Sequence, residues 1–205
     1  MTARYLVSID QSKSKEEMEE NAALAIHFSS SPYMVGVDLS GNVAQGKDNV
    51  SITLDILNKC KNAGLKIAAH IAETAEIDKV QSAQLLALSP DRLGHATFID
   101  CESSEGRRVQ SQNMMIECCL TSNILCKTVP SYREHHLVRW AALDHPVIIC
   151  TDDAGVFNTS LSQEYQLAIQ HCGFTLDGLR KMNLRAADFI FDESMKKPLI
   201  DLLQS

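Results

Sequence analysis

The stretch VIICTDDAGVF, residues 147–157, places two adjacent aspartates one residue after an apolar run of four residues. Uninterrupted apolar runs are typical of strands that are covered on both faces, as in parallel sheets. Residues 146–150 therefore predict a strand, and five further runs do the same, at residues 4–9, 33–39, 65–71, 92–96 and 114–120. The segments between them predict helices; in one of them Ile52, Ile56 and Cys60 share a helical face. This alternation indicates β/α units around a parallel sheet, in a single domain of residues 1–205.

Polar residues or glycine follow the predicted strands at intervals of 25–31 residues, at Asp10, Gly41, His70, His95, Ser122 and Asp152. One β/α unit takes about 30 residues. Reactive side chains at the carboxyl ends of successive parallel strands are how (β/α)8 barrels build an active site. Because neighbouring side chains leave a strand on opposite sides, we expect Asp152 and Asp153 to face different targets, one a metal and the other a substrate.

The charge and composition of the chain limit the classes of molecule that it is expected to bind. Its 205 residues carry a formal net charge of −7, which disfavours a nucleic acid or an anionic membrane as the main partner and leaves small molecules and proteins. The first residues have too short an apolar run for a secretory signal, and no run approaches the roughly 18 residues of a membrane span. The seven cysteines form no C-x-x-C pair, which suits buried, reduced thiols. We expect a cytoplasmic protein.

Four motifs in a fixed order carry a family resemblance: HIAE (70–73), RLGHA (92–96), CLTSN (119–123) and TDDAGVF (151–157). They resemble the adenosine/AMP deaminase branch of the metal-dependent hydrolases. Further segments, VGVDLSG (35–41), TVPSYREHH (128–136) and LSQEYQLA (161–168), resemble the members that act on N6-methyl-AMP. The resemblance extends from about residue 4 to residue 191. It implies a TIM-type (β/α)8 barrel and hydrolytic removal of the amine from C6 of a purine, with N6-methyl-AMP favoured over AMP or adenosine.

The resemblance also implies the roles of four site residues. His70 and Asp152 would hold one zinc ion, which lowers the pKa of its bound water towards 7 and so supplies the nucleophile. Glu73 would protonate N1 of the purine ring. His95 would orient and deprotonate the attacking water. Removal of the C6 amine needs the nucleophile, the proton for N1 and the base for the water together.

Substrate contacts are implied at three further positions. Asp153 would hydrogen-bond the purine ring, Gly41 would offer its backbone to the base, and Asp10 is a weaker candidate. Each has a structural alternative, since adjacent aspartates are common in turns and Gly41 sits where a turn residue is expected. Two alternatives stay open for each of two further pairs: a site role or turn formation for Ser122 and Asn123, and the mouth of the site or a surface loop for His135 and His136. Three histidines match no site motif and are expected to be structural: His27, His145 and His171.

The sequence departs from the family in one respect that concerns the metal. Family members carry His-x-His on an early strand, which supplies two zinc ligands, and this chain contains no His-x-His. Aligned by motifs, its six strands correspond to strands 3–8 of the eight-stranded barrel, and about 250 residues are typical of a whole one. His70 and Asp152 alone fall short of the three protein ligands typical of catalytic zinc. We therefore expect an incomplete barrel from a fragment, isoform or incomplete gene model, with negligible turnover alone and self-association through its open edges.

Two other functions are alternatives to a zinc-dependent purine deaminase. The first is a non-catalytic, truncated chain that binds a ligand or a partner protein, which the missing His-x-His favours. The second is a different metal-dependent hydrolase of the same superfamily. Many binuclear members place a metal-bridging lysine after strand 4, whereas DLSG (38–41) has none. The zinc deaminases with H-x-E and P-C-x-x-C motifs find no match in this chain.

Overall fold

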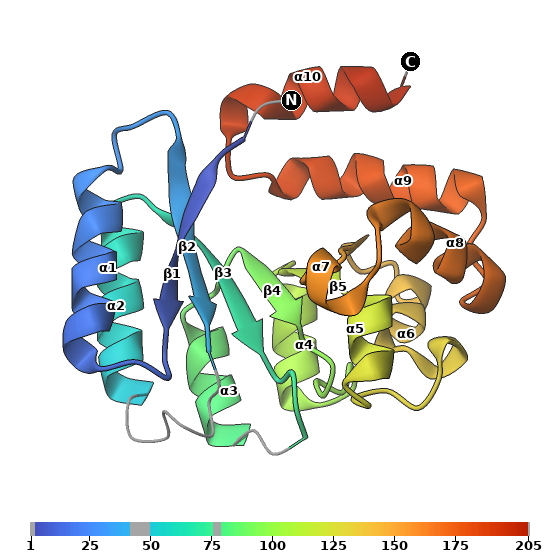
Figure 1. Ribbon diagram of the computed structural model, residues 1–205, viewed down its shortest axis with the longest axis horizontal. Coiled ribbons are helices and arrows are strands. Elements are labelled where there is room, and N and C mark those ends of the chain that lie inside the picture. Colours follow the sequence, from blue (N-terminus) through green and yellow to red (C-terminus); the bar gives the residue numbers. More distant parts are fainter. Residues whose placement is uncertain (1–2, 42–49, 76–78, 205) are drawn as a thin grey trace.

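The computed structural model describes residues 3–41, 50–75 and 79–204 (Figure 1). All six predicted strands form, and each lies within two residues of its predicted bounds. They are β1 Tyr5–Asp10, β2 Met34–Ser40, β3 Lys66–Ile71, β4 Arg92–His95, β5 Met115–Cys118 and β6 Val147–Ile149. Every neighbouring pair is parallel, and the strands follow one another in chain order across one sheet. The predicted α/β class and parallel sheet are confirmed.

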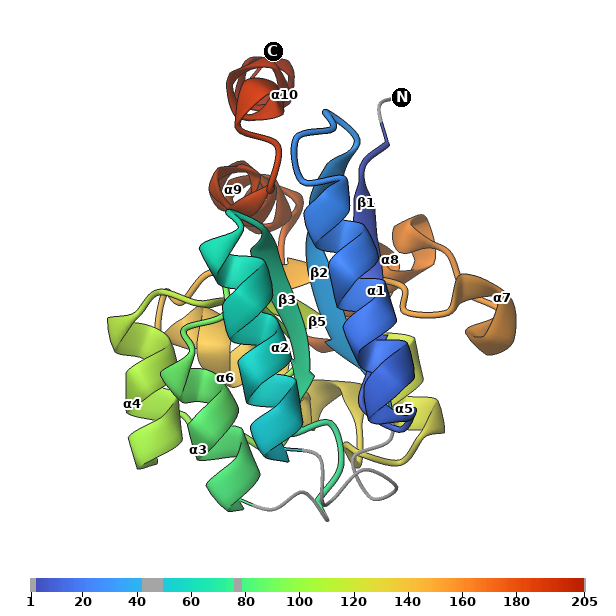
Figure 2. The same ribbon diagram turned by 90° about the vertical axis from the view of Figure 1, so that its left-hand side faces the viewer.

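The helices alternate with the strands as the sequence predicts. They are α1 Lys15–His27, α2 Val50–Asn62, α3 Lys79–Ala87, α4 Ser104–Ser111, α5 Leu120–Leu125, α6 His136–Ala142, α7 Ala154–Phe157, α8 Leu161–His171, α9 Leu176–Ala186 and α10 Glu193–Gln204, with 3-10 helices at Tyr132–Glu134 and Ala187–Phe189. Helices α1 to α4 lie in order along one face of the sheet, while α9 and α10 run across the amino-terminal ends of the strands (Figures 1 and 2). No described helix is long and apolar enough to cross a membrane.

The hydrophobic core lies between the sheet and these helices. On β2, Val37 and Leu39 are fully buried, while the intervening Asp38 is only half-buried because it points to the other face. On the helix side, Ile56 and Leu57 of α2 are likewise inaccessible. The expectation that both faces of the strands are covered therefore holds for the helix-facing side and only in places on the other, where Ala68 and Met115 are buried but Asp38 is not.

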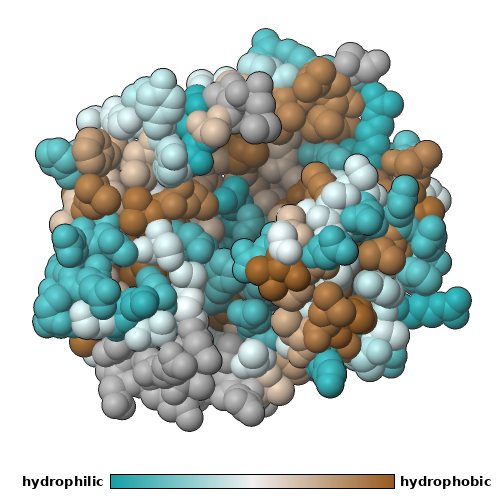
Figure 3. Space-filling view, viewed as in Figure 1, coloured by the Kyte–Doolittle hydropathy of each residue, from teal (hydrophilic) through white to brown (hydrophobic). Residues whose placement is uncertain are grey.

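The second face of the sheet is the inner wall of a partial barrel. Its half-buried side chains include Asp38, His70, Arg92 and Glu117. The molecule is hollowed near the centre of this face, where hydrophilic residues lie beside hydrophobic ones (Figure 3). Strands β1 and β6 each pair with one neighbour among the described residues, so the sheet has two open edges.

Candidate active site

The carboxyl-terminal ends of the strands have an unusual backbone. Ala72, His95, Ala96 and Asp152 have φ values of 47°, 57°, 51° and 55°, in the left-handed region that few residues other than glycine adopt. They follow or end β3, β4 and β6. Such residues cost on the order of 1–3 kcal/mol each and cluster at functional sites, where the surrounding structure holds them in place. Ser89, Asn113 and Asp144, before β4, β5 and β6, also have positive φ, so this edge is marked as the candidate site by strained backbone together with the polar side chains gathered there.

His70 is held in a fixed orientation on β3. Its ring lies over Gly94 of β4, where an added Cβ would lie 3.0 Å from the His70 Cδ2 atom, so a side chain there would force the ring to shift. His70 Nδ1 lies 3.1 Å from the Leu39 carbonyl oxygen and 3.2 Å from Asp38 Oδ1. The hydrogen bond to Asp38 raises the pKa of His70 to about 9. With Nδ1 engaged, Nε2 is the ring nitrogen left for a ligand, an arrangement typical of metal-binding histidines.

His95 connects the other predicted residues at this edge. Its Nε2 atom lies 3.7 Å from Glu73 Oε1 and 3.6 Å from Asp152 Oδ2, and its ring centroid lies 5.4 Å from that of His70. Only 3% of His95 is exposed, and its Nδ1 atom has no hydrogen-bond partner among the described residues. Burial lowers the pKa of His95, which favours the neutral ring. The structure thus brings His70, Glu73, His95 and Asp152 together, although they are up to 82 residues apart in sequence.

The two aspartates do face different surroundings, but for a different reason than strand alternation. Strand β6 ends at Ile149, and Asp152 has left-handed backbone, so the pair lies in a turn before α7. Asp152 Oδ1 accepts a hydrogen bond from the Asp153 backbone N–H at 2.8 Å, and its other oxygen faces His95. Asp153 is exposed to solvent. The substrate contact predicted for Asp153 stays a prediction.

Gly41 and Asp10 lie together at the ends of β2 and β1. Gly41 has a φ of 92°, where a side chain is strained, and an added Cβ would lie 1.9 Å from Asp10 Oδ1 and displace that carboxylate. Asp10 Oδ1 accepts hydrogen bonds from the Ser12 backbone N–H at 2.9 Å and from its hydroxyl at 2.7 Å. This is a local turn, which matches the structural alternative given for Gly41. Their predicted substrate contacts stay predictions, and residues 42–49, which follow Gly41, lie outside the described residues.

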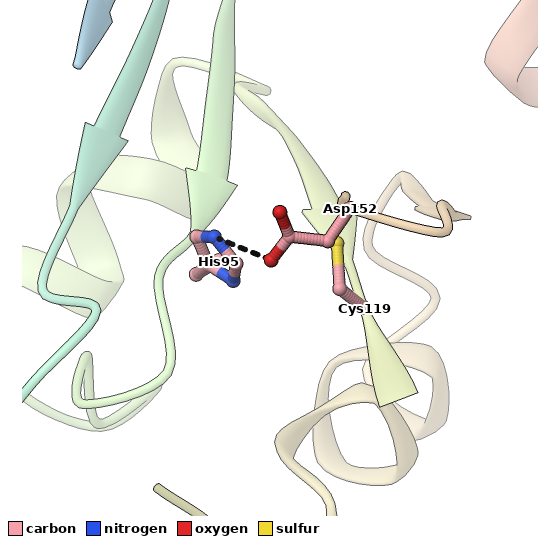
Figure 4. A group of neighbouring side chains, drawn as sticks. All are labelled: His95, Cys119 and Asp152. Atoms are coloured by element: carbon pink, nitrogen blue, oxygen red, sulfur yellow. Dashed lines mark ion pairs between the residues drawn. The ribbon is translucent and has the colours of Figure 1, made fainter. Parts of the chain in front are cut away.

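A site residue that the sequence interpretation missed is Cys119. A thiol, an imidazole nitrogen and a carboxylate oxygen from Cys119, His95 and Asp152 all lie within 4.8 Å of one another (Figure 4). Burial raises the pKa of the Cys119 thiol far above its usual range. The cysteines were expected to be buried apolar residues; adjacent cysteines at a strand end, pointing to opposite sides, were the available signal.

Behind His95 lies a buried polar network. The His136 Nε2–H donates to the His95 carbonyl oxygen at 2.8 Å and so holds the strained end of β4. His135 stacks on His136 at 4.3 Å and contacts Asn123 Oδ1 at 3.0 Å through Nε2, while Asn123 Nδ2 donates to Thr97 Oγ1 at 3.2 Å. The surface-loop alternative for the two histidines is therefore wrong, since both rings are buried. Asn123 is a buried connecting residue of α5, not a turn former.

The types of ligand at this edge, an imidazole and a carboxylate, suit a zinc ion. His70 offers an imidazole whose other nitrogen is already engaged, and Asp152 offers a half-buried carboxylate, both of which are common zinc ligands. In number, however, these two residues fall one short of the three protein ligands usual in catalytic zinc sites. Zinc binding by His70 and Asp152 stays a prediction.

Comparison with known proteins decides the family, because the adenosine deaminase family model matches residues 1–205. The chain belongs to the adenosine deaminase family. It is 43% identical over 197 residues to the N6-methyl-AMP deaminase of Danio rerio, covering 92% of this chain and 55% of the relative, and 40% identical over 198 residues to that of Homo sapiens, covering 92% and 54%. The chain thus spans about half the length of the curated relatives it matches.

Solved structures agree with this placement in the family. The Arabidopsis N6-mAMP deaminase matches with a TM-score of 0.89 and 34% identity, over 98% of this chain and 58% of that one. The complex of Arabidopsis ADAL with IMP matches with a TM-score of 0.88 and 33% identity, over 98% and 57%. A zinc-bound amidohydrolase from Burkhoderia ambifaria, 19% identical with a TM-score of 0.80, shares the fold. The six-stranded sheet is therefore part of the barrel that these deaminases share.

Proposed function

We propose that the carboxyl edge of this sheet serves the zinc-dependent hydrolytic deamination of N6-methyl-AMP or a related N6-substituted adenine nucleotide. The observation that carries the proposal is the position of His95, whose Nε2 lies between the carboxylates of Glu73 and Asp152 at 3.7 and 3.6 Å. The reaction joins water to C6 of the purine and releases methylamine, leaving IMP. Support for the substrate comes from the curated relatives, which are N6-methyl-AMP deaminases, and from the Arabidopsis complex with IMP.

Each residue of this edge has a role in that reaction. His70 and Asp152 would hold the zinc, which when bound supplies an activated water. His95, buried and neutral, takes a proton from the attacking water at Nε2. Glu73, 43% exposed on the open side of His95, gives a proton to N1 of the purine.

The substrate-facing part of the proposal concerns the rim of the site. Asp153 is exposed beside Asp152 and would hydrogen-bond the purine ring. Gly41 would present its backbone to the base, with Asp10 as a weaker contact. A net charge of −7 supports a small nucleotide rather than a nucleic acid or a membrane as the partner, in a cytoplasmic setting.

The ligand count limits what the 205-residue chain does alone. Because it has no His-x-His, His70 and Asp152 lack the further imidazoles that the family resemblance implies. We therefore expect negligible turnover by the chain alone. The open edges of β1 and β6 present unpaired backbone groups, which favours association with a second copy or with a polypeptide that continues the sheet. A binding module without turnover is thus the second candidate function.

Complementation tests the proposal. The chain is expressed alone and together with the part of the Danio rerio deaminase that it does not match, which is expected to carry a His-x-His strand. Release of IMP from N6-methyl-AMP is measured with added zinc, and AMP and adenosine are compared as substrates. We expect turnover of N6-methyl-AMP by the pair and not by either piece. A stable complex that binds IMP without turning over any of the three compounds would favour the binding module.

A further inference from the structure

Glu164 on α8 is a buried carboxylate without a cationic partner. Its side chain is inaccessible, and none of the ion pairs among the described residues includes it. Oε1 accepts hydrogen bonds from the hydroxyls of Thr121 and Thr159, the latter at 2.6 Å, and Oε2 accepts the Thr121 backbone N–H at 3.0 Å. Because burying a charge is costly unless hydrogen bonds replace its water, these three bonds are what holds Glu164 in the interior.

The three donors belong to two segments at the carboxyl edge of the sheet. Thr121 lies in the first turn of α5, the helix that follows β5. Thr159 follows α7, which itself begins directly after Asp153. Glu164 therefore joins the segment that carries Asp152 and Asp153 to the helix at the end of the neighbouring strand.

The α5 side of this connection is firmly anchored. Cys119, which precedes α5, makes no side-chain capping hydrogen bond, and the Thr121 N–H is one of the first-turn amides that have no partner within a helix. Glu164 accepts that N–H and the hydroxyl of the same residue. Two of the three hydrogen bonds of the carboxylate thus fix it to α5, and the third is left for Thr159.

Residues 151–159 have little else to hold them in place. None of them is buried, and α7 projects from the body of the molecule (Figure 2). Their other hydrogen bonds stay within the segment, as when the Thr159 N–H donates to the Ala154 carbonyl at 3.1 Å. Among the described residues, the bond from the Thr159 hydroxyl to Glu164 is the one hydrogen bond that leaves it.

The backbone of Asp152 makes this anchoring matter. Asp152 has left-handed backbone, with a φ of 55°, which persists only where the surrounding structure holds it. Its Oδ2 atom lies 3.6 Å from His95 Nε2, too far for a hydrogen bond that would fix the segment. The position of Asp152 therefore depends on how the rest of its segment is attached.

We propose that Glu164 is a positioning residue for the proposed deamination. Through Thr159, its buried carboxylate holds the segment of Asp152 and Asp153 against α5 and so keeps Asp152 in front of His95. The role in deamination rests on the proposed function, whereas the attachment of the segment does not depend on turnover. A purely structural carboxylate would stabilise the fold without fixing Asp152, so stability and site geometry are the quantities to separate.

Thr159→Val tests the attachment on the 205-residue chain alone, because it removes the hydroxyl donor and keeps the branching of the side chain. Amide hydrogen exchange of Val156 and Phe157 in α7, recorded by NMR, should become faster on the order of tenfold, as expected for loss of one hydrogen bond to a charged group. Thr159→Ser keeps the hydroxyl and should restore the original rates. Glu164→Ala should speed exchange at the same amides, and adding Thr159→Val to it should change them no further.

Tyr165→Phe is the matched control. It removes a hydroxyl from the residue next to Glu164 on α8, and that hydroxyl donates to Asn183 Oδ1 of α9 at 2.6 Å, away from the Asp152 segment. The variant should lose about as much stability in urea unfolding as Thr159→Val does. The exchange rates of the α7 amides should stay as in the unaltered chain.

Turnover separates positioning from structure. In the chain complemented with part of the Danio rerio deaminase, kcat/KM for N6-methyl-AMP should fall on the order of tenfold or more in Thr159→Val, since small misplacements of site groups are costly. It should recover in Thr159→Ser and stay unchanged in Tyr165→Phe.

Two results would overturn the proposal. Unchanged exchange of the α7 amides in Thr159→Val would show that Glu164 does not hold the segment. Faster exchange with unchanged kcat/KM, or an equal fall of kcat/KM in Tyr165→Phe, would refute the positioning role. Absence of turnover by the unaltered complemented chain is instead a failure of the proposed function, and it is distinguishable because exchange is measured without turnover.

Discussion

Charged side chains are paired differently at the amino-terminal and carboxyl-terminal ends of the sheet. At the amino-terminal end, Arg4 pairs with Asp192 at 2.6 Å, and Arg92 pairs with Glu117 at 3.1 Å while its guanidinium lies 3.8 Å from the centre of the Phe191 ring. At the carboxyl-terminal end, His70 pairs with Asp38 at 3.2 Å, but the carboxylates of Glu73 and Asp152 stay 3.7 and 3.6 Å from His95 Nε2, and His95 and Asp152 have left-handed backbone. Paired charges hold the fold together, whereas unpaired ones on strained backbone are arranged to meet a ligand.

The largest effect we expect concerns turnover and the carboxyl-terminal end. In the complemented chain, Glu73→Gln removes the proton that N1 of the purine would receive, so kcat should fall on the order of 100-fold or more. Because Glu73 is 43% exposed and shares no short ion pair, the free energy of unfolding should change by less than about 0.5 kcal/mol. Steady-state release of IMP and urea unfolding measure the two quantities.

A glutamate-to-glutamine substitution at the amino-terminal end of the sheet, Glu193→Gln, is the control for Glu73→Gln. Glu193 at the start of α10 is 70% exposed and pairs with Lys196. Glu193→Gln should leave both kcat and stability within error of the unaltered protein. If kcat were unchanged in Glu73→Gln, or fell equally in both variants, the role of Glu73 would be refuted.

A smaller effect, on stability, is expected at the amino-terminal end. Glu117→Ala leaves the largely buried Arg92 guanidinium, 17% exposed, without its carboxylate. This ion pair is intermediate in exposure between a buried and a surface pair. We therefore expect the free energy of unfolding to fall by about 2 kcal/mol. A double-mutant cycle with Arg92→Ala, followed by urea unfolding, measures the coupling. A coupling near zero would show that this end does not depend on pairing for stability.

The fold was more predictable from the sequence than the site. Strand positions follow from local apolar runs, so all six were predicted within two residues, and His70, His95 and Asp152 followed from their place after those runs. Cys119 and the His136 contact with His95 depend on which loops meet in space, which no local pattern encodes. The sequence predicts Asp152 at a strand end, but the strand ends at Ile149 and Asp152 lies in the following turn with left-handed backbone.

The buried network behind His95 predicts a pH dependence of stability. The Leu137 N–H donates to His135 Nδ1 at 3.1 Å, and Nε2 contacts Asn123 at 3.0 Å, so the neutral ring is fully bonded. Burial lowers the pKa of His135 from 6.5 to about 3. The folded state then binds fewer protons than the unfolded state between these values. Stability is fully present above about pH 6.5 and falls as the pH drops, by at most about 1.4 kcal/mol per pH unit from this residue.

Urea unfolding of His135→Gln across this pH range measures the contribution. The slope of stability against pH should become shallower than in the unaltered chain by up to that amount. His27→Gln, at an exposed position on α1, is the control and should leave the slope unchanged. An identical slope in His135→Gln would contradict the pH dependence that we attribute to the lowered pKa of His135.

Histidine ring NMR during titration with Zn²⁺ and then IMP compares the two ends of the sheet in one experiment. His70 and His95 lie at the carboxyl-terminal end, whereas His145 precedes β6 at the amino-terminal end, with its Nε2–H donating to the Met114 carbonyl at 2.7 Å. We expect the ring signals of His70 and His95 to shift in both steps while His145 stays in place. Saturable shifts confined to His145, or no shift at His95 with either ligand, would contradict a binding site at the carboxyl edge.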